Sequence, residues 1–197
     1  MSWKNLTKRI ITSIPLIFLL CLSFYYSYIL IISLIIISLI SWIEFQALIL
    51  KIFKKNYYKL IINLLGLIYL TIFSSLIFSG IMQEDFKMNM VYLFSICIFS
   101  DIGGLIFGKI FKGKKLTKIS PNKTISGSIG SFILSLALAP IFYFLLNDKF
   151  LNLLDLVLLS IFVSFLCQIG DLFISFLKRK AKVKDTGNIL PGHGGLL

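Results

Sequence analysis

Residues 151–184 read LNLLDLVLLSIFVSFLCQIGDLFISFLKRKAKVK, and they set the fold class of the chain. The part from Leu151 to Leu177 is almost wholly apolar and exceeds the roughly 20 residues that a helix needs to cross a bilayer. A dense group of cations follows at once: Lys178, Arg179, Lys180, Lys182 and Lys184. An apolar helix that ends in such a group is typical of a membrane span with its last turn at the cytoplasmic surface.

The same helix carries a polar stripe. Residues three or four apart share one helix face, and five polar side chains follow that spacing: Ser164, Gln168, Asp171, Ser175 and Lys178. An ionisable group inside a membrane span is costly, so it usually faces a bundle interior or a water-filled cavity. We therefore expect a hydrated groove along this face that opens to the cytoplasm.

Apolar runs of similar length recur along the whole chain. It has 197 residues, of which 58% are hydrophobic, and its mean hydropathy is +0.96. The sequence predicts an all-α integral membrane protein that forms a single polytopic domain over residues 1–197. We expect about six spans: Ile10–Phe24, Tyr28–Trp42, Leu60–Ser79, Met90–Lys109, Ile125–Leu146 and Leu151–Leu177.

Charge predicts the orientation of these spans. The formal net charge is +12, from 20 lysines and arginines against 8 acidic residues. With both termini in the cytoplasm, every cation except Lys87 and Lys149 lies in a cytoplasmic segment, as the positive-inside rule requires. Membrane topology thus explains the charge, and we expect no nucleic-acid partner. No small-residue cleavage site follows the first apolar run, so this run is predicted to be a retained helix rather than a signal peptide.

Two further segments contain candidate functional residues. Asp101 lies within the fourth predicted span, where a carboxylate favours a functional role. Gly104 and Gly108 are predicted to allow close helix packing instead. In the next loop, Lys123 stands between Ser120-Pro121 and Thr124, and a cation beside hydroxyl groups suits a phosphate.

Other polar and sulfur-containing residues in the spans are given structural roles. Thr124 is also a candidate N-cap for the fifth span. The small residues that follow are predicted to pack against a neighbouring helix: Ser128, Ser131, Ser135 and Ala139. Glu44 is interpreted as a solvated carboxylate at the inner end of the second span. Cys21, Cys97 and Cys167 are interpreted as small core residues.

The C-terminal motifs resemble a known family. The chain contains Ser175-x-x-Lys178-Arg179, then Lys184-Asp185, then Pro191-Gly192-His193-Gly194-Gly195. This order is similar to the signature of phosphatidate cytidylyltransferases, the CDP-diacylglycerol synthases. Ser120-Pro121-x-Lys123-Thr124 resembles a second motif of that family, and the segment at Asp101 resembles a third.

The resemblance implies an enzyme that transfers the cytidylyl group of CTP to phosphatidate and releases pyrophosphate, with a catalytic region over about residues 98–197. It implies Mg²⁺ on Asp171, with Asp101 or Asp185 as a further ligand and a second cation left open. It also implies that phosphate groups are bound by Lys178, Arg179, Ser175, Ser120, Lys123, Thr124 and Lys184. Asp185 would be a second carboxylate or would organise Lys184, and His193, Gly194 and Gly195 would line the polyphosphate site.

Several alternatives stay open. A CTP-dependent lipid kinase of the polyprenol or phytol type would use similar cations but transfer the γ-phosphate. A transporter of anionic solutes would be expected to show matching halves, and no repeat is found. In the family, the pattern continues with Asp-Arg-x-x-Asp after the position of Leu197. A further hypothesis is therefore that this chain is a truncated or degenerate synthase with low or no activity. The predicted location is a bacterial inner membrane, and a homodimer is left open.

Overall fold

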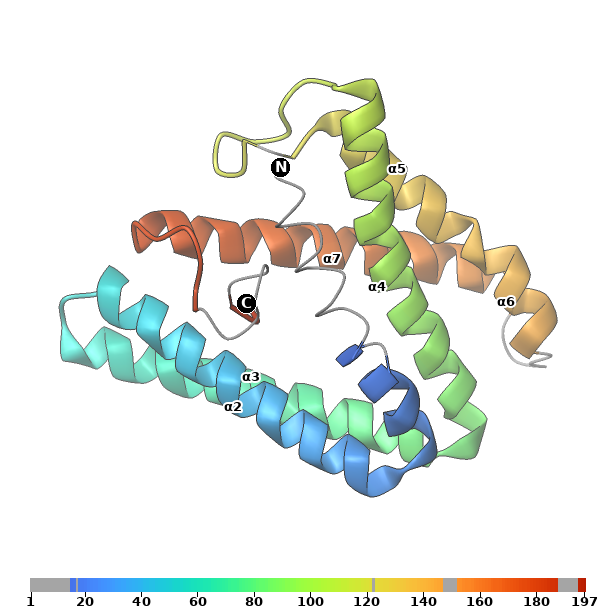
Figure 1. Ribbon diagram of the computed structural model, residues 1–197, viewed down its shortest axis with the longest axis horizontal. Coiled ribbons are helices and arrows are strands. Elements are labelled where there is room, and N and C mark those ends of the chain that lie inside the picture. The colour runs from blue at the N-terminus through green and yellow to red at the C-terminus, as the bar shows by residue number, and fades with distance from the viewer. Residues whose placement is uncertain (1–14, 17, 122, 147–151, 188–194) are drawn as a thin grey trace. The chain divides into compact units, whose positions relative to one another are not determined.

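The computed structural model describes residues 15–16, 18–121, 123–146, 152–187 and 195–197. It confirms the all-α class, because every regular element in these ranges is a helix apart from one isolated bridge between Lys115 and Thr124. Residues 18–25 are helical. The longer elements, shown in Figure 1, are α2 (Ser27–Ile52), α3 (Asn56–Met82), α4 (Glu84–Phe111), α5 (Ile125–Leu136), α6 (Leu138–Leu146) and α7 (Leu153–Lys180).

Five helical segments are long and apolar enough to cross a membrane. They correspond to five of the six predicted spans: Ser27–Ile52, Asn56–Met82, Phe86–Phe111, Ile125–Leu145 and Leu153–Lys180. The predicted first span, Ile10–Phe24, is described in part, and its described residues 15–16 and 18–24 are helical. The predicted end of the second span at Trp42 was wrong, because α2 continues for more than two turns to Ile52.

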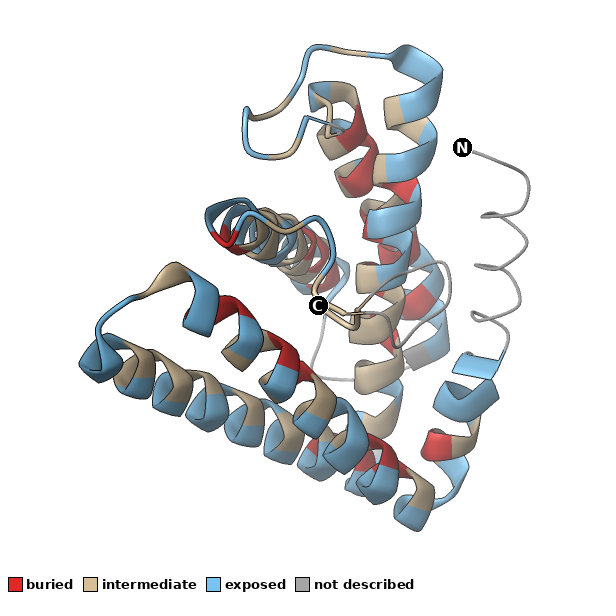
Figure 2. Cartoon of the chain, turned by 60° about the vertical axis from the view of Figure 1, so that its left-hand side comes forward, coloured by how far each residue is buried: buried red, intermediate tan, exposed pale blue. Residues whose placement is uncertain are grey.

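The chain divides into two compact units, residues 1–83 with 177–197, and residues 84–176. In the first unit α2 and α3 lie side by side, joined by a short connection after Ile52 (Figure 1). The hydroxyl groups of Ser38 and Ser74 are 2.7 Å apart across this pair. Figure 2 shows that α3 is largely exposed, and its buried residues are Gly80 and Ile81 only. A surface of this kind suits contact with lipid.

Glu44 corrects one interpretation from the sequence. It is buried rather than solvated, with 3% of the residue exposed. Its carboxylate accepts hydrogen bonds from the Thr186 hydroxyl and from the backbone N–H groups of Leu196 and Leu197. Because these donors replace water, the charge can stay within the helix. This explains why α2 does not end where the carboxylate appears in the sequence.

In the second unit, α4 and α5 pack backbone against backbone. A Cβ added to Gly130 would lie 2.8 Å from the carbonyl oxygen of Gly103 and would overlap the Phe107 side chain. A Cβ added to Gly127 would lie 2.8 Å from the carbonyl oxygen of Gly104. The predicted packing role of Gly104 and Gly108 is thus confirmed: a Cβ on Gly104 would lie 2.9 Å from Ser131 Oγ, and one on Gly108 would lie 3.7 Å from the Cα of Gly127.

A hydrophobic core joins α4, α6 and α7. Its buried members are Tyr92, Ile96, Leu138, Ala139, Phe142 and Leu156. The Tyr92 hydroxyl is 2.9 Å from the carbonyl oxygen of Leu156 and 2.6 Å from the Ser160 hydroxyl, so this buried polar group has partners. Nearby, the sulfur atoms of Cys97 and Cys167 are 3.1 Å apart. These contacts fix how α7 lies against α4 within the unit.

The fifth predicted span is interrupted once. Helix α5 ends at Leu136, Ala137 intervenes, and α6 begins at Leu138. Pro140 explains the break, because it has no N–H to donate to the carbonyl oxygen of Leu136, four residues earlier. The two short helices together still provide the length of one membrane span.

The close packing of α4 and α5 predicts an effect on stability. Gly103→Ala should destabilise the protein by about 1–3 kcal/mol, because the added methyl group would overlap the backbone of Gly130. A fall in the thermal unfolding midpoint in detergent would measure this. Gly170→Ala is the matched control, since a Cβ there meets no atom within 4 Å and alanine favours a helix. Equal midpoints for the two variants would contradict the packing.

Candidate functional site

A cavity of about 370 Å³ lies within the second unit, between α4, α5, α7 and the loop that joins α4 to α5. It brings together residues from the three segments that the sequence singled out. Its lining residues are Ser100, Asp101, Gly104, Leu105, Leu116, Ser120, Lys123, Thr124, Gly127, Ser128, Ser131, Gln168 and Asp171. Polar groups therefore converge on one cavity although they come from distant parts of the sequence.

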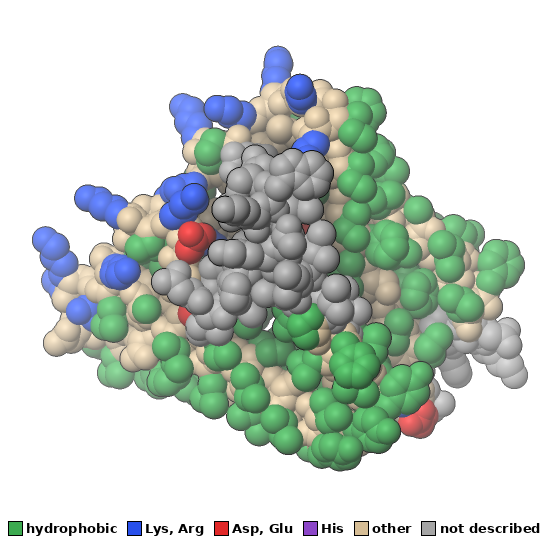
Figure 3. Space-filling model, viewed as in Figure 1, with side chains coloured by type: hydrophobic (Ala, Val, Ile, Leu, Met, Phe, Trp, Pro, Cys, Tyr) green, Lys and Arg blue, Asp and Glu red, His purple; other side chains and the backbone are tan. Residues whose placement is uncertain are grey.

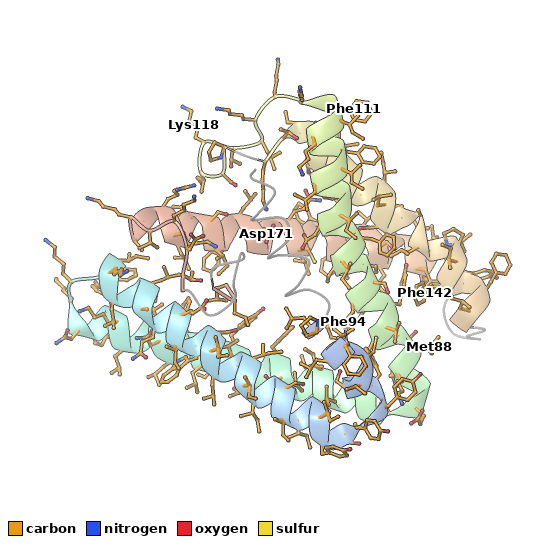
Figure 4. All side chains as sticks on the ribbon, viewed as in Figure 1. Met88, Phe94, Phe111, Lys118, Phe142 and Asp171 are labelled. Carbon is orange, nitrogen blue, oxygen red and sulfur yellow. The ribbon has the colours of Figure 1, made fainter. Side chains whose placement is uncertain are left out.

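The main contact in this cavity is an ion pair. Lys123 Nζ is 2.6 Å from Asp171 Oδ2, which joins the loop before α5 to the middle of α7. Figure 4 shows Asp171 on α7. The Lys123 side chain is 29% exposed and that of Asp171 is 56% exposed, so both remain accessible to a ligand. A cation and a carboxylate thus lie side by side in an open cavity within the apolar part of the chain.

Local structure explains why Lys123 lies there. The backbone N–H of Lys123 donates to the carbonyl oxygen of Ser120, which closes a tight turn with Pro121 at its second position. Thr124 follows as the N-cap of α5, and its hydroxyl accepts from the Gly127 N–H at 3.1 Å. The predicted cap is therefore confirmed. Turn and cap together fix the direction in which the lysine leaves the backbone.

The loop before this turn is strongly positive. Lys109 lies in the last turn of α4, and four exposed lysines follow before Lys123: Lys112, Lys114, Lys115 and Lys118. The hydrogen bonds of Leu116 to Lys123 and of Ile125 to Lys114 fold the loop back on itself. Figure 3 shows that cationic side chains gather around this loop, whereas hydrophobic side chains cover the visible face of α4 and α6. The cavity therefore adjoins a surface that attracts anions.

Further polar groups line the cavity. Asp101 of α4 lines it together with Asp171. The Ser128 hydroxyl of α5 donates to Gln168 Oε1 of α7, and no partner is found for Gln168 Nε2 among the described residues. One turn earlier on α7, Ser164 is fully buried against the Ser100 hydroxyl at 2.9 Å. The polar stripe therefore lines the cavity only in part, because Ser164 serves helix packing.

The remaining predicted residues are not among the lining residues of this cavity. Ser175 lies on α7, and Arg179, Lys184 and Asp185 are exposed. Lys178 Nζ donates to the carbonyl oxygen of Leu197 at 3.1 Å. Gly195 packs against Thr186 and Glu44, and the predictions for His193 and Gly194 lie outside the described residues. The roles inferred for all these residues stay predictions.

The donor set of the cavity fits a hard divalent cation. Mg²⁺ is commonly held by one or two carboxylates together with phosphate oxygens and water. Asp101 and Asp171 supply two carboxylates, and hydroxyl oxygens lie around them. In the described part of the chain, no three His, Cys, Asp or Glu side chains cluster as a metal site. The lining residues thus offer two carboxylates to a cation, and phosphate oxygens and water would be its other ligands.

The model of the cytidylyltransferase family matches residues 2–197. The chain belongs to the cytidylyltransferase family. It is similar to a protein from Rickettsia prowazekii (strain Madrid E) named phosphatidate cytidylyltransferase, at 35% identity over 98% of this chain and 85% of that protein. The predicted family is thus confirmed.

Two other proteins named phosphatidate cytidylyltransferase align with a smaller part of this chain. A protein from Rickettsia typhi (strain ATCC VR-144 / Wilmington) is 39% identical over 68% of this chain and 61% of its own length. One from Bacillus subtilis (strain 168) is 43% identical over 56% of this chain and 42% of its own length. The chain therefore spans less than two thirds of these two relatives. No solved structure matches this cytidylyltransferase-family chain.

Three residues of this family member were undervalued from sequence. Glu44 was interpreted as solvated, although a carboxylate followed by six further residues without charge before Lys51 indicates burial. Gln168 was placed on the polar stripe but given no role. Its neighbour Ser128 was assigned to packing alone, whereas it hydrogen-bonds to Gln168 within the cavity. Only the hydrogen bond between α5 and α7 shows that Ser128 and Gln168 act together.

Proposed function

We propose that the protein transfers the cytidylyl group of CTP to phosphatidate, giving CDP-diacylglycerol and pyrophosphate. The family match over residues 2–197 carries this proposal, and the Lys123–Asp171 cavity supports it. In the reaction, an oxygen of the phosphatidate phosphate attacks the α-phosphorus of CTP. The bond between that phosphorus and the bridging oxygen to the β-phosphorus breaks, and pyrophosphate leaves with the bonding electrons.

The nucleophile belongs to the substrate and is already anionic, so the protein needs no catalytic serine or cysteine. Its task is to bring two anions together, to align them and to stabilise the charge that moves to pyrophosphate. Lys123 supplies a positive charge in the cavity, and the hydroxyl groups of Ser120 and Thr124 can donate hydrogen bonds to phosphate oxygens. The surrounding lysine-rich loop raises the local concentration of both anions.

Asp171 and Asp101 would hold Mg²⁺. When bound, this ion screens the charge of the phosphates and polarises the α-phosphate. Lys123 Nζ lies 2.6 Å from Asp171 Oδ2, so the lysine compensates the charge of this carboxylate. The assignments of Lys178, Arg179, Ser175, Lys184, Asp185 and His193 to phosphate binding, and of Asp185 as an alternative metal ligand, belong to the same proposal.

The proposal is tested with purified protein in vesicles that contain phosphatidate and Mg²⁺. CTP labelled at the α-phosphorus should give labelled lipid and one pyrophosphate for each lipid formed. CTP labelled at the γ-phosphorus should leave the lipid unlabelled. Transfer of the γ-label to a lipid alcohol, with release of CDP, would instead indicate a lipid kinase and would overturn the proposal.

The proposed setting is the cell membrane of a bacterium, with both termini on the cytoplasmic side. The acyl chains of phosphatidate then stay in the bilayer, and its phosphate meets CTP at the cytoplasmic surface. The lysines near the cavity support this orientation, because positive loops are retained in the cytoplasm.

This topology predicts the position of labels. A cysteine introduced at position 85, in the first turn of α4, should react with an impermeant maleimide added to the outside of intact cells. A cysteine at position 54, between α2 and α3, should react only after the cells are opened. Labelling of position 54 from outside would contradict the orientation.

A further inference from the structure

The connection between α4 and α5 (Figure 1) pairs with itself along two arms, residues 113–116 and 123–126. The arms run antiparallel, as the isolated bridge between them shows. The Leu116 N–H donates to the carbonyl oxygen of Lys123 at 2.8 Å. Lys123 therefore starts the second arm, and the first arm holds its backbone.

One side chain closes these arms at the helix end. Ser126 is the second residue of α5, and its hydroxyl oxygen accepts a hydrogen bond from the Gly113 N–H at 3.2 Å. The same hydroxyl lies 3.1 Å from the hydroxyl of Thr124, the N-cap of α5. The Thr124 oxygen accepts from the Gly127 N–H, so the Thr124 hydroxyl hydrogen can be donated to Ser126. Ser126 thus links the exit of α4 to the start of α5.

The first arm is shaped to meet this hydroxyl. A Cβ added to Gly113 would lie 2.8 Å from Ser126 Oγ and 3.1 Å from Ser126 Cβ, so a side chain there would push the serine away. The preceding residue, Lys112, has a φ of 42°, in the left-handed region that is unfavourable for a residue with a side chain. Such a backbone persists only where its surroundings hold it. The bond from Gly113 to Ser126 is a contact that holds this turn.

We propose that Ser126 is a positioning residue that holds Lys123 in the cavity. The inference rests on the proposed function, which assigns Lys123 to the phosphate groups of the substrates. Ser126 is not among the cavity-lining residues, so it acts through the paired arms and does not touch the substrate. A lysine whose backbone is already fixed loses less conformational freedom when it binds a phosphate.

The first measurement needs no turnover. Ser126→Ala removes the hydroxyl, while alanine favours the helix and should leave α5 intact. Hydrogen exchange of the Gly113 amide should become at least roughly 10-fold faster, because this amide loses its acceptor. Ser95→Ala is the matched control, since the Ser95 hydroxyl is also partly buried in this unit and donates to the carbonyl oxygen of Val91 in its own helix. Unchanged exchange at Gly113 in Ser126→Ala would overturn the proposal.

The second measurement concerns catalysis. Ser126→Ala should lower kcat/KM for CTP by roughly 10-fold, a tenfold change corresponding to about 1.4 kcal/mol. Gly113→Ala should act in the same direction, because its methyl group would displace the Ser126 hydroxyl. Ser126→Thr should keep the wild-type value, since threonine retains a hydroxyl. Faster exchange at Gly113 with an unchanged kcat/KM would refute the positioning role.

A double variant separates positioning of the lysine from general support of the fold. In a Lys123→Gln background, Ser126→Ala should lower the remaining kcat/KM by less than roughly 2-fold, because no lysine is left to position. A further tenfold loss would show that Ser126 acts independently of Lys123 and would also refute the proposal. If the wild-type protein forms no CDP-lipid, the proposed function fails, and exchange at Gly113 alone decides whether Ser126 joins the two arms.

Discussion

Asp171→Asn should lower CDP-diacylglycerol formation by roughly 100-fold or more, which is the scale on which a single charge-stabilising group acts in a catalytic site. The side chain keeps its size but loses the charge that Lys123 contacts at 2.6 Å. Asparagine offers one neutral oxygen where a divalent cation prefers a carboxylate. The measurement is the initial rate as a function of Mg²⁺ concentration. The loss should be only partly recovered at high Mg²⁺.

Asp155→Asn is the control for this variant. Asp155 lies in the first turn of the same helix, is exposed, and accepts a local hydrogen bond from the Asn152 N–H at 3.0 Å. The Asp155→Asn variant should lose little activity. Both variants should elute from size exclusion and unfold in detergent like the wild type. An Asp171→Asn protein with wild-type turnover and wild-type Mg²⁺ dependence would refute the role of this carboxylate.

Lys123→Gln should have the second largest effect, with kcat/KM for CTP lowered by roughly 100-fold. The change removes the cation that the turn at Pro121 and the cap at Thr124 hold in the cavity. Lys118→Gln is the control, because this exposed lysine lies in the same loop but is not among the cavity-lining residues, and Figure 4 shows its place. If both variants lost activity equally, the loop would contribute only general positive charge.

The double variant gives an independent test of the ion pair. Because Lys123 and Asp171 are in contact, the effects of Lys123→Gln and Asp171→Asn should not add. The combined loss should be close to that of Asp171→Asn alone. Losses that multiply would indicate that the two residues act in separate places.

The parts predicted from sequence are those that depend on local pattern. The spans follow from long apolar runs, and the cap at Thr124 and the packing glycines of α4 follow from residue type and spacing. Asp171 and Lys123 were each singled out, and the structure places them in one cavity. Their ion pair could not be predicted, because it depends on how α5 packs against α7 across 48 positions of sequence.

The burial of Glu44 could not be predicted from local sequence. A carboxylate near the predicted end of a membrane helix is usually solvated, and the donors that bury this one lie more than 140 positions later in the sequence. Local pattern carries no information about such a partner. The predicted second span ended at Trp42, two residues before Glu44, whereas α2 continues to Ile52 and distant hydrogen bonds offset the cost of burying the charge.

The contact between α4 and α5 has a consequence for how this protein can change in evolution. Most helix interfaces drift by paired replacements, in which one side chain shrinks as its neighbour grows. Gly103 and Gly130 have no side chain to shrink, and each lies against the backbone of the other helix. No second substitution can compensate for a first one there. These positions should therefore stay glycine in a library selected for growth, while exposed apolar residues of α4 that do not line the cavity, such as Ile106 and Ile110, exchange freely.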